Sequence, residues 1–284
     1  KVTSKVNDFS PEQLQNLTCI VHLYRGNSAK FHRTVQQYKD TSASLAHATG
    51  KAITELQLQF NKVYTMISGF ADTLAKENSE AQKFVQALHL EDANTLTVLQ
   101  NTLIANAAKA SADLHILEPI AQQCKALRKP QDKLIKQFLD AVAAGIKELQ
   151  LSKNKVWKEL GIKEHLDQLK SLQQKLSGNP NEEEPGLLHE TEYFWKQAVW
   201  LTSRFPDGVY ADVEGLCKVV TRAEIASKDW SLSPGRYVGV DTATDDDFDY
   251  EERLSEIHIE LEGLNEEAAR LAAQISENYK GLFS

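Results

Sequence analysis

The feature that most constrains the fold is a stripe of large apolar residues whose spacing alternates between three and four. Its members are Ile53, Leu56, Phe60, Val63, Ile67, Phe70 and Leu74. This spacing places all of them on one narrow face of an α-helix, which is typical of helices that lie along one another. With only 13 Gly and 7 Pro in 284 residues, few turns interrupt the chain. The sequence therefore predicts a mainly α fold of long antiparallel helices, or a coiled-coil hairpin.

Local signals predict where several helices begin and end. A capping box after Ser10, with Pro at the first helical position, starts a helix that Gly26 ends. A long helix is predicted from about residue 92 to 127, with a bend at Pro119, and Pro130 is expected to interrupt the helical run.

The sequence loses its helical periodicity after Pro206. A Pro-Asp-Gly turn and β-prone runs predict a small irregular patch with short β-strands near 205–240. Inside the patch, Thr221 and Glu224 form a capping box that opens one short helix. The tryptophans expected to anchor the core are Trp195, Trp200 and Trp230.

The last part of the chain carries a second apolar stripe with the same alternating spacing. Its members are Leu254, Ile257, Leu261, Leu264, Ala268, Leu271, Ile275 and Leu282. Four heptads exceed what a surface helix needs and favour a partner helix. The acidic run at 241–252 is predicted to be a solvated linker that gives this helix reach. Packing against the stripe at 53–74 is the alternative.

Two stretches resemble the modification subunits of type I restriction-modification systems. The segment "WLTSRFPDGVYADVEGLCKVVTRAEIASKDWSLSPGRYVGV" (200–240), with "YEERLSEIHIELEGLNEEA" (250–268), resembles their C-terminal end. The opening "VNDFSPEQLQNLTCIVHLYRG" (6–26) resembles the stretch that follows their methyltransferase core. The residues singled out as structural motifs are Tyr24, Arg25, Gly26, Pro234, Gly235, Arg236 and Tyr237. Of these, Pro234 and Gly235 predict a turn, and Arg236 and Tyr237 are expected to fix a strand-like piece against the preceding helix.

The resemblance implies an adenine-N6 DNA methyltransferase that uses S-adenosylmethionine. The family's core carries a cofactor-binding glycine motif and an Asn-Pro-Pro-aromatic motif. In this sequence the nearest match starts at Asn179, and it lacks the second Pro and the aromatic residue that would stack on a flipped adenine. We therefore expect no catalytic, cofactor-binding or metal-binding residues in this chain. S-adenosylmethionine and catalysis would belong to the parent protein.

The resemblance further implies a docking role. The final stripe would bind the specificity subunit through helix–helix contacts, DNA would be reached through the assembled complex, and the restriction subunit is a further expected partner. A generic helical scaffold unrelated to methylation is the alternative. The predicted segments are helices after the absent core at 1–40, a long helical insertion at 41–178, a helix with a small mixed region at 179–240, the linker at 241–252 and the coiled-coil helix at 253–284.

Composition excludes several other classes of protein. The formal charge of −8 argues against most of the surface lying on a phosphate backbone. The segment 125–175 holds 12 Lys or Arg against 6 Asp or Glu, but because acidic residues alternate with them we interpret it as a solvated helix surface rather than a DNA contact.

No apolar run approaches membrane-spanning length, and three scattered cysteines favour a reducing, cytoplasmic location. Because the first residue is Lys1 rather than Met, we expect a fragment of a longer protein.

Overall fold

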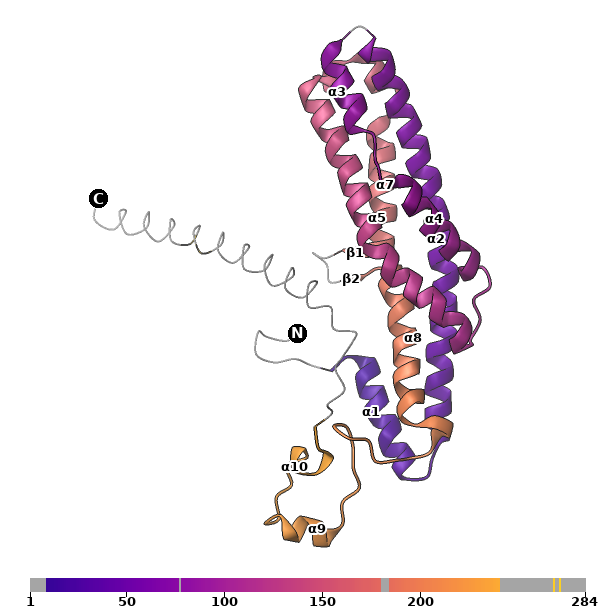
Figure 1. The fold of residues 1–284 in the computed structure, drawn as a ribbon, viewed down its shortest axis with the longest axis vertical. Coiled ribbons are helices and arrows are strands. Elements are labelled where there is room, and N and C mark those ends of the chain that lie inside the picture. The colour runs from indigo at the N-terminus through magenta and orange to yellow at the C-terminus, as the bar shows by residue number, and fades with distance from the viewer. Residues whose placement is uncertain (1–8, 77, 180–183, 241–267, 269–270, 272–284) are drawn as a thin grey trace, which may run out of the picture. The chain divides into compact units, whose positions relative to one another are not determined.

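The computed structural model describes residues 9–76, 78–179, 184–240, 268 and 271, and it divides into two units, Lys1–Ala211 and Asp212–Ser284. The first unit is helical, which confirms the predicted mainly α class (Figure 1). Its helices are α1 (Pro11–Tyr24), α2 (Ala29–Ala75), α3 (Ser79–Ala87), α4 (Ala93–Ala107), α5 (Leu114–Glu148), α6 (Lys155–Glu159), α7 (Ile162–Ser177) and α8 (Leu187–Arg204), with 3-10 turns η1 (Leu151–Lys153) and η2 (Pro206–Gly208).

Helix α2 is the axis of this unit. Its 47 residues span about 70 Å at 1.5 Å per residue. The predicted stripe lies on its buried face: Ile53, Leu56, Val63 and Ile67 are at most 1% exposed, and the remaining members pack against the same core. The helix begins well before this stripe, at Ala29, so the first predicted segment boundary, at residue 40, falls inside one continuous helix.

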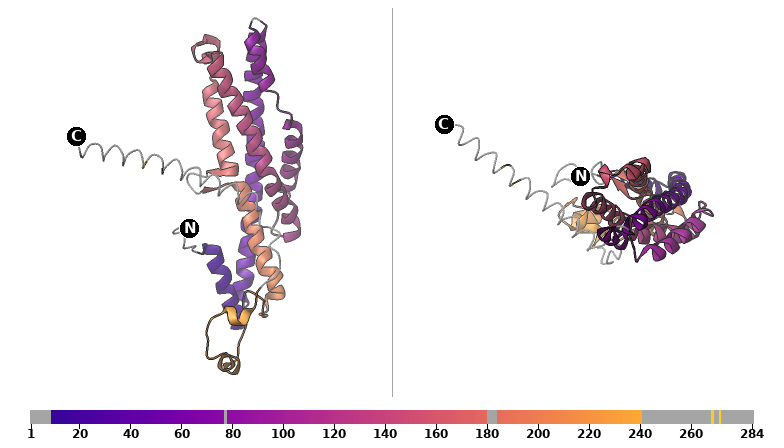
Figure 2. Two further views of the ribbon diagram at one scale, coloured as in Figure 1. Left: turned by 60° about the vertical axis from the view of Figure 1, so that its left-hand side comes forward. Right: turned by 90° about the horizontal axis from the view of Figure 1, so that it is seen from above.

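Helices α7 and α8 together run antiparallel to α2. The Gln59 side-chain amide donates to the His165 carbonyl oxygen at 2.9 Å, where α2 meets α7. Nearer the start of α2, the Ser42 hydroxyl donates to the Thr191 carbonyl oxygen of α8 at 3.0 Å. As residue numbers fall along α2 they rise along its partners, and Figures 1 and 2 show α7 beside one half of α2 and α8 beside the other.

A short hairpin separates α7 from α8. Strand β1 (Gly178–Asn179) pairs antiparallel with β2 (Glu184–Pro185), and Gly186 then caps α8. A Cβ atom added to Gly186 would lie 2.2 Å from the Gly178 nitrogen and 2.4 Å from the Leu176 carbonyl oxygen. The chain therefore returns to the point where it left α7, and the two helices together line α2.

Replacing Gly186 by Ala should destabilise the first unit, because the new methyl group meets backbone atoms that cannot move aside. Overpacking of this kind costs about 1–3 kcal/mol. Urea unfolding followed by circular dichroism measures the effect. The matched control is Gly69→Ala, since a Cβ there meets no atom within 4 Å and alanine favours an exposed helix by about 1 kcal/mol. Equal stability of the two variants would contradict the tight junction.

The structure corrects two predictions about helices. The helix predicted over 92–127 is interrupted, because α4 ends at Ala107 and Asp113 starts α5 by accepting the His115 backbone N–H at 2.9 Å. Pro130 does not interrupt the helical run, since α5 continues through it. Pro119 and Pro130 both lie on the exposed side of α5, where water can pair with a carbonyl group that lacks its N–H partner.

The β-strands predicted near 205–240 are a further correction. In the described part of the chain this region holds one isolated antiparallel bridge, between Val213 and Cys217, and no strand. The β-prone residues lie in turns around two short helices, α9 (Arg222–Ser227) and α10 (Gly235–Val238). Among the described residues of this region only Val213 and Cys217 pair as strand residues do, and strand propensity depends on such pairing.

Candidate interaction surfaces

The predicted partner-binding stripe lies largely outside the described residues. Only Ala268 and Leu271 of that stripe are described; both are helical and exposed, and Leu271 is 45% exposed. The other members, Leu254, Ile257, Leu261, Leu264, Ile275 and Leu282, lie outside the described part, as does the acidic run at 241–252.

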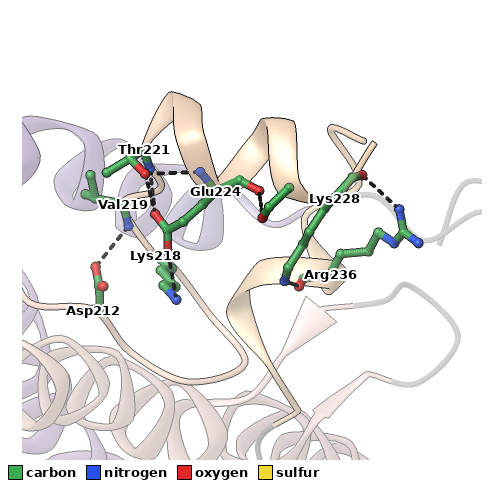
Figure 3. Close-up of polar contacts among 8 residues, drawn as sticks. Asp212, Lys218, Val219, Thr221, Glu224, Lys228 and Arg236 are labelled. Carbon is green, nitrogen blue, oxygen red and sulfur yellow. Dashed lines mark hydrogen bonds and ion pairs between the residues drawn. The ribbon is translucent and has the colours of Figure 1, made fainter. Parts of the chain in front are cut away.

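The described part of the second unit is built on hydrogen bonds. Helix α9 starts with the predicted capping box: the Thr221 N–H donates to the Glu224 carboxylate at 2.7 Å, and the Glu224 N–H donates to the Thr221 hydroxyl oxygen at 3.2 Å (Figure 3). The bond from the Thr221 backbone lowers the pKa of the Glu224 carboxyl group. On the approach to α9, the Val219 N–H donates to the Asp212 carboxylate at 3.0 Å.

Helix α10 is attached to the end of α9 by its Arg236 and Tyr237. The Arg236 guanidinium donates to the Lys228 carbonyl oxygen at 3.3 Å, and the Lys228 ammonium group donates to the Arg236 carbonyl oxygen (Figure 3). The Tyr237 hydroxyl donates to the Ser231 carbonyl oxygen, with the Lys228 nitrogen 4.6 Å from the ring centroid. These side chains fix a helical turn to its predecessor, in place of the predicted strand-like piece. Pro234 precedes this turn as its N-cap residue, and Gly235 is its first residue.

Trp230 is a surface residue, which corrects its prediction as a core anchor. Its side chain is 59% exposed. The φ angle of Trp230 is 58° and that of Asp229 before it is 54°, so both residues have a positive φ. Such a conformation is unfavourable for a residue with a side chain and is found where the surroundings impose it. Arg222 lies over the ring at 5.8 Å, and Leu232 nearby is 78% exposed. No residue in 212–240 is buried, so this region has apolar side chains but no core of its own.

Helix α1 carries a second exposed apolar surface, which the sequence analysis did not identify. One face of α1 is buried in the first unit, with Cys19 fully buried. The other face presents Leu14, Leu17 and Val21, which are 50%, 38% and 47% exposed. These residues share a face because they are separated by three and four positions. The signal was present in the sequence, since α1 has apolar residues on more than one side.

The motif residues Tyr24, Arg25 and Gly26 end this helix. Arg25 is its C-cap, and Gly26 has φ 73°, the left-handed conformation that glycine adopts without strain. The Tyr24 ring meets Tyr210 edge to face, with the centroids 5.7 Å apart. In the described molecule these residues form the end of α1, and Tyr24 is 59% exposed although its ring contacts Tyr210.

A buried ion pair joins α5 to α8. The Glu192 side chain is 5% exposed and accepts from Arg128 at 2.5 Å and from Lys196 at 2.9 Å. Burial raises the pKa of the neighbouring Cys124 thiol to about 12, and the Glu192 carboxylate adds to this shift. A thiol with such a pKa is inert at neutral pH, so Cys124 is a packing residue rather than a nucleophile.

Replacing Arg128 by Met should destabilise the unit by about 3 kcal/mol, because it removes one of the two cations that compensate a buried carboxylate. The double variant Arg128→Met/Glu192→Leu should recover most of this loss, since Lys196 is 33% exposed and can turn to water. Urea unfolding of both variants checks the prediction. A double variant less stable than the single one would show that the charges are not coupled.

Among the described residues, no group of three or more His, Cys, Asp or Glu side chains is placed to hold a metal ion. Basic residues of 125–175 include Lys133, which pairs with Asp92 at 3.3 Å, and Lys155, which lies 3.9 Å from Glu159. No helix in the described part of the chain is long and apolar enough to cross a membrane.

Part of this chain is similar in sequence to a known protein. A segment of 83 residues, 29% of this chain, is 37% identical to the Type I restriction enzyme HindI methylase subunit of Haemophilus influenzae. The matched segment spans 18% of that protein. No family model matches the chain, and no solved structure matches it. Part of this chain is therefore similar to a type I methylase subunit, in agreement with the resemblance drawn from the sequence.

Proposed function

We propose that this chain is a non-catalytic, helical region of a type I methylase subunit that docks the catalytic core onto the specificity subunit. The observation that carries the proposal is the 83-residue similarity to the HindI methylase subunit. S-adenosylmethionine binding and adenine methylation then belong to the parent protein. DNA is reached through the assembled complex, and the restriction subunit is a further partner of that complex.

The exposed apolar side chains support a docking role. Trp230 and Leu232 are exposed in a region without buried residues, and Trp is among the residues that most often dominate protein–protein binding energy. Segments this small rarely form a stabilising core of their own. Contacts with a partner would therefore supply the burial of apolar side chains that the described region lacks. The apolar stripe at 254–282 supports the same role by its heptad spacing.

A generic helical scaffold unrelated to methylation is the competing function. The bundle in the first unit would serve either role, because long packed helices are suited to any assembly. What favours the methylase subunit is the local similarity rather than the fold.

The double variant Leu261→Asp/Leu264→Asp tests the docking proposal. Each buried leucine contributes about 1.5–3 kcal/mol, and an unpaired carboxylate in an apolar interface adds a further penalty. We expect the variant to fail to copurify with the specificity subunit of its own system while its melting temperature in isolation is unchanged. The control is Leu58→Asp, because Leu58 is 68% exposed on α2 and should tolerate a charge.

Two outcomes would contradict the proposal. A fall of several degrees in the melting temperature of the isolated double variant would mean that the stripe packs on its own chain. An unchanged melting temperature with unchanged copurification would mean that the stripe serves neither purpose, and the scaffold function would then be favoured.

A further inference from the structure

A cavity between α2, α4 and α5 has the character of a ligand site. Its volume is about 540 Å³, within the range of small-molecule sites. The aliphatic part of its lining includes Leu56, Leu96 and Leu134, all buried. The aromatic part is formed by Phe60 and Tyr64, whose rings stack with centroids 6.0 Å apart. Such surfaces contact the faces of a planar ring.

A chain of side-chain amides runs from the lining into the core. Its members Gln57, Gln100 and Asn101 line the cavity together with the polar residues Asn61, His89, Asn94 and Thr97. Gln57 of α2 donates to the Gln100 oxygen of α4 at 2.9 Å, and the Gln100 nitrogen donates to the Gln131 oxygen of α5 at 3.0 Å. Gln57 also donates to Asn101 at 3.1 Å. In this order of bonds the Gln100 oxygen accepts from Gln57 and the Gln100 nitrogen donates to Gln131.

This arrangement leaves hydrogen-bonding capacity on Gln100. An amide has two N–H donors and an oxygen with two acceptor positions, and the bonds to Gln57 and Gln131 use one of each. Gln100 lines the cavity and is only 5% exposed, so its remaining donor and acceptor lie in a poorly hydrated place. The Gln131 nitrogen, in a side chain that is fully buried, has no hydrogen-bond partner among the described residues.

The residue types in the lining indicate which ligands the cavity can bind. None of the described residues that line the cavity is Asp, Glu, Lys or Arg, and His89 is the one imidazole among them, so a charged ligand would find no carboxylate, ammonium or guanidinium group as a counter-ion. We propose that this cavity binds an uncharged aromatic amide, or a planar heterocycle with the same adjacent donor and acceptor. The ring would lie against Phe60 and Tyr64, and its amide would form a two-bond pair with Gln100. The site is separate from the proposed docking function.

Three monosubstituted benzenes test the proposal on the full chain: benzamide, benzoate, which has nearly the same shape as benzamide, and toluene, which has no polar group. Titrations are followed by the side-chain amide signals of Gln and Asn in ¹H–¹⁵N NMR spectra. Benzamide should shift the Gln100 signal and bind at least about tenfold more tightly than toluene, because it adds a pair of hydrogen bonds. Benzoate should bind more weakly than benzamide by a similar factor, since it is charged and cannot donate.

Two variants test whether the compounds bind in the cavity rather than elsewhere on the surface. Gln100→Leu removes the amide but also leaves Gln131 without its bond and Gln57 with Asn101 alone, so a second variant, Ala93→Phe, fills the cavity and keeps every amide. Both should abolish the preference for benzamide. Ala105→Phe is the matched control, because Ala105 is exposed on the same helix and does not line the cavity. Equal affinity for the three compounds, no shift at Gln100, or full binding by Ala93→Phe would overturn the proposal.

Discussion

The packing of the apolar face of α2 against α7, α8, α4 and α5 is the interaction on which the first unit depends. Ile53, Val63 and Ile67 are fully buried along this face, and each contributes about 1.5–3 kcal/mol on burial. Because α2 is so long, no single neighbour covers it. Helix α7 packs along one half of α2 and α8 packs along the other. The hairpin between them leaves and rejoins the bundle at one place, which requires a residue without a side chain at Gly186.

The two units differ in how their described residues are held. The first has a continuous core together with buried polar bonds, among them the pair between Arg128 and Glu192. The described part of the second has capping and side-chain hydrogen bonds but no buried residue. A region with exposed Trp230 and without a core is suited to contact with another molecule, whereas the first unit is suited to holding a fixed shape. This contrast underlies the docking function that we propose.

Much of the helical fold could be predicted because periodicity and capping are local signals. The stripe on α2 and the capping boxes at Ser10 and Thr221 correspond to observed elements. Pro130 was misleading because the effect of a proline depends on whether its helix face meets water, which is a tertiary property. The exposure of Trp230 was also missed, since side-chain type alone does not reveal whether a neighbouring element will cover it.

The cavity and the buried ion pair depend on contacts between distant residues. Gln57, Gln100 and Gln131 are unremarkable in sequence and become a chain only when three helices meet. The same is true of Arg128 and Glu192, which are 64 positions apart. The stripe at 254–282 differs from these sites, because its heptad spacing is evident in the sequence. Most of its members lie outside the described residues, so its role stays a prediction.

Hydrogen exchange of the chain, alone and bound to the specificity subunit, tests the central claim most directly. The account predicts slow exchange of the backbone amides around Ile53 to Ile67 in both samples, because the core of the first unit is already complete. It also predicts that the amides of 254–282 exchange more slowly in the complex than in the free chain. Rapid exchange along α2, or a complex in which protection increases only within the first unit, would contradict a preformed bundle that docks through its C-terminal segment.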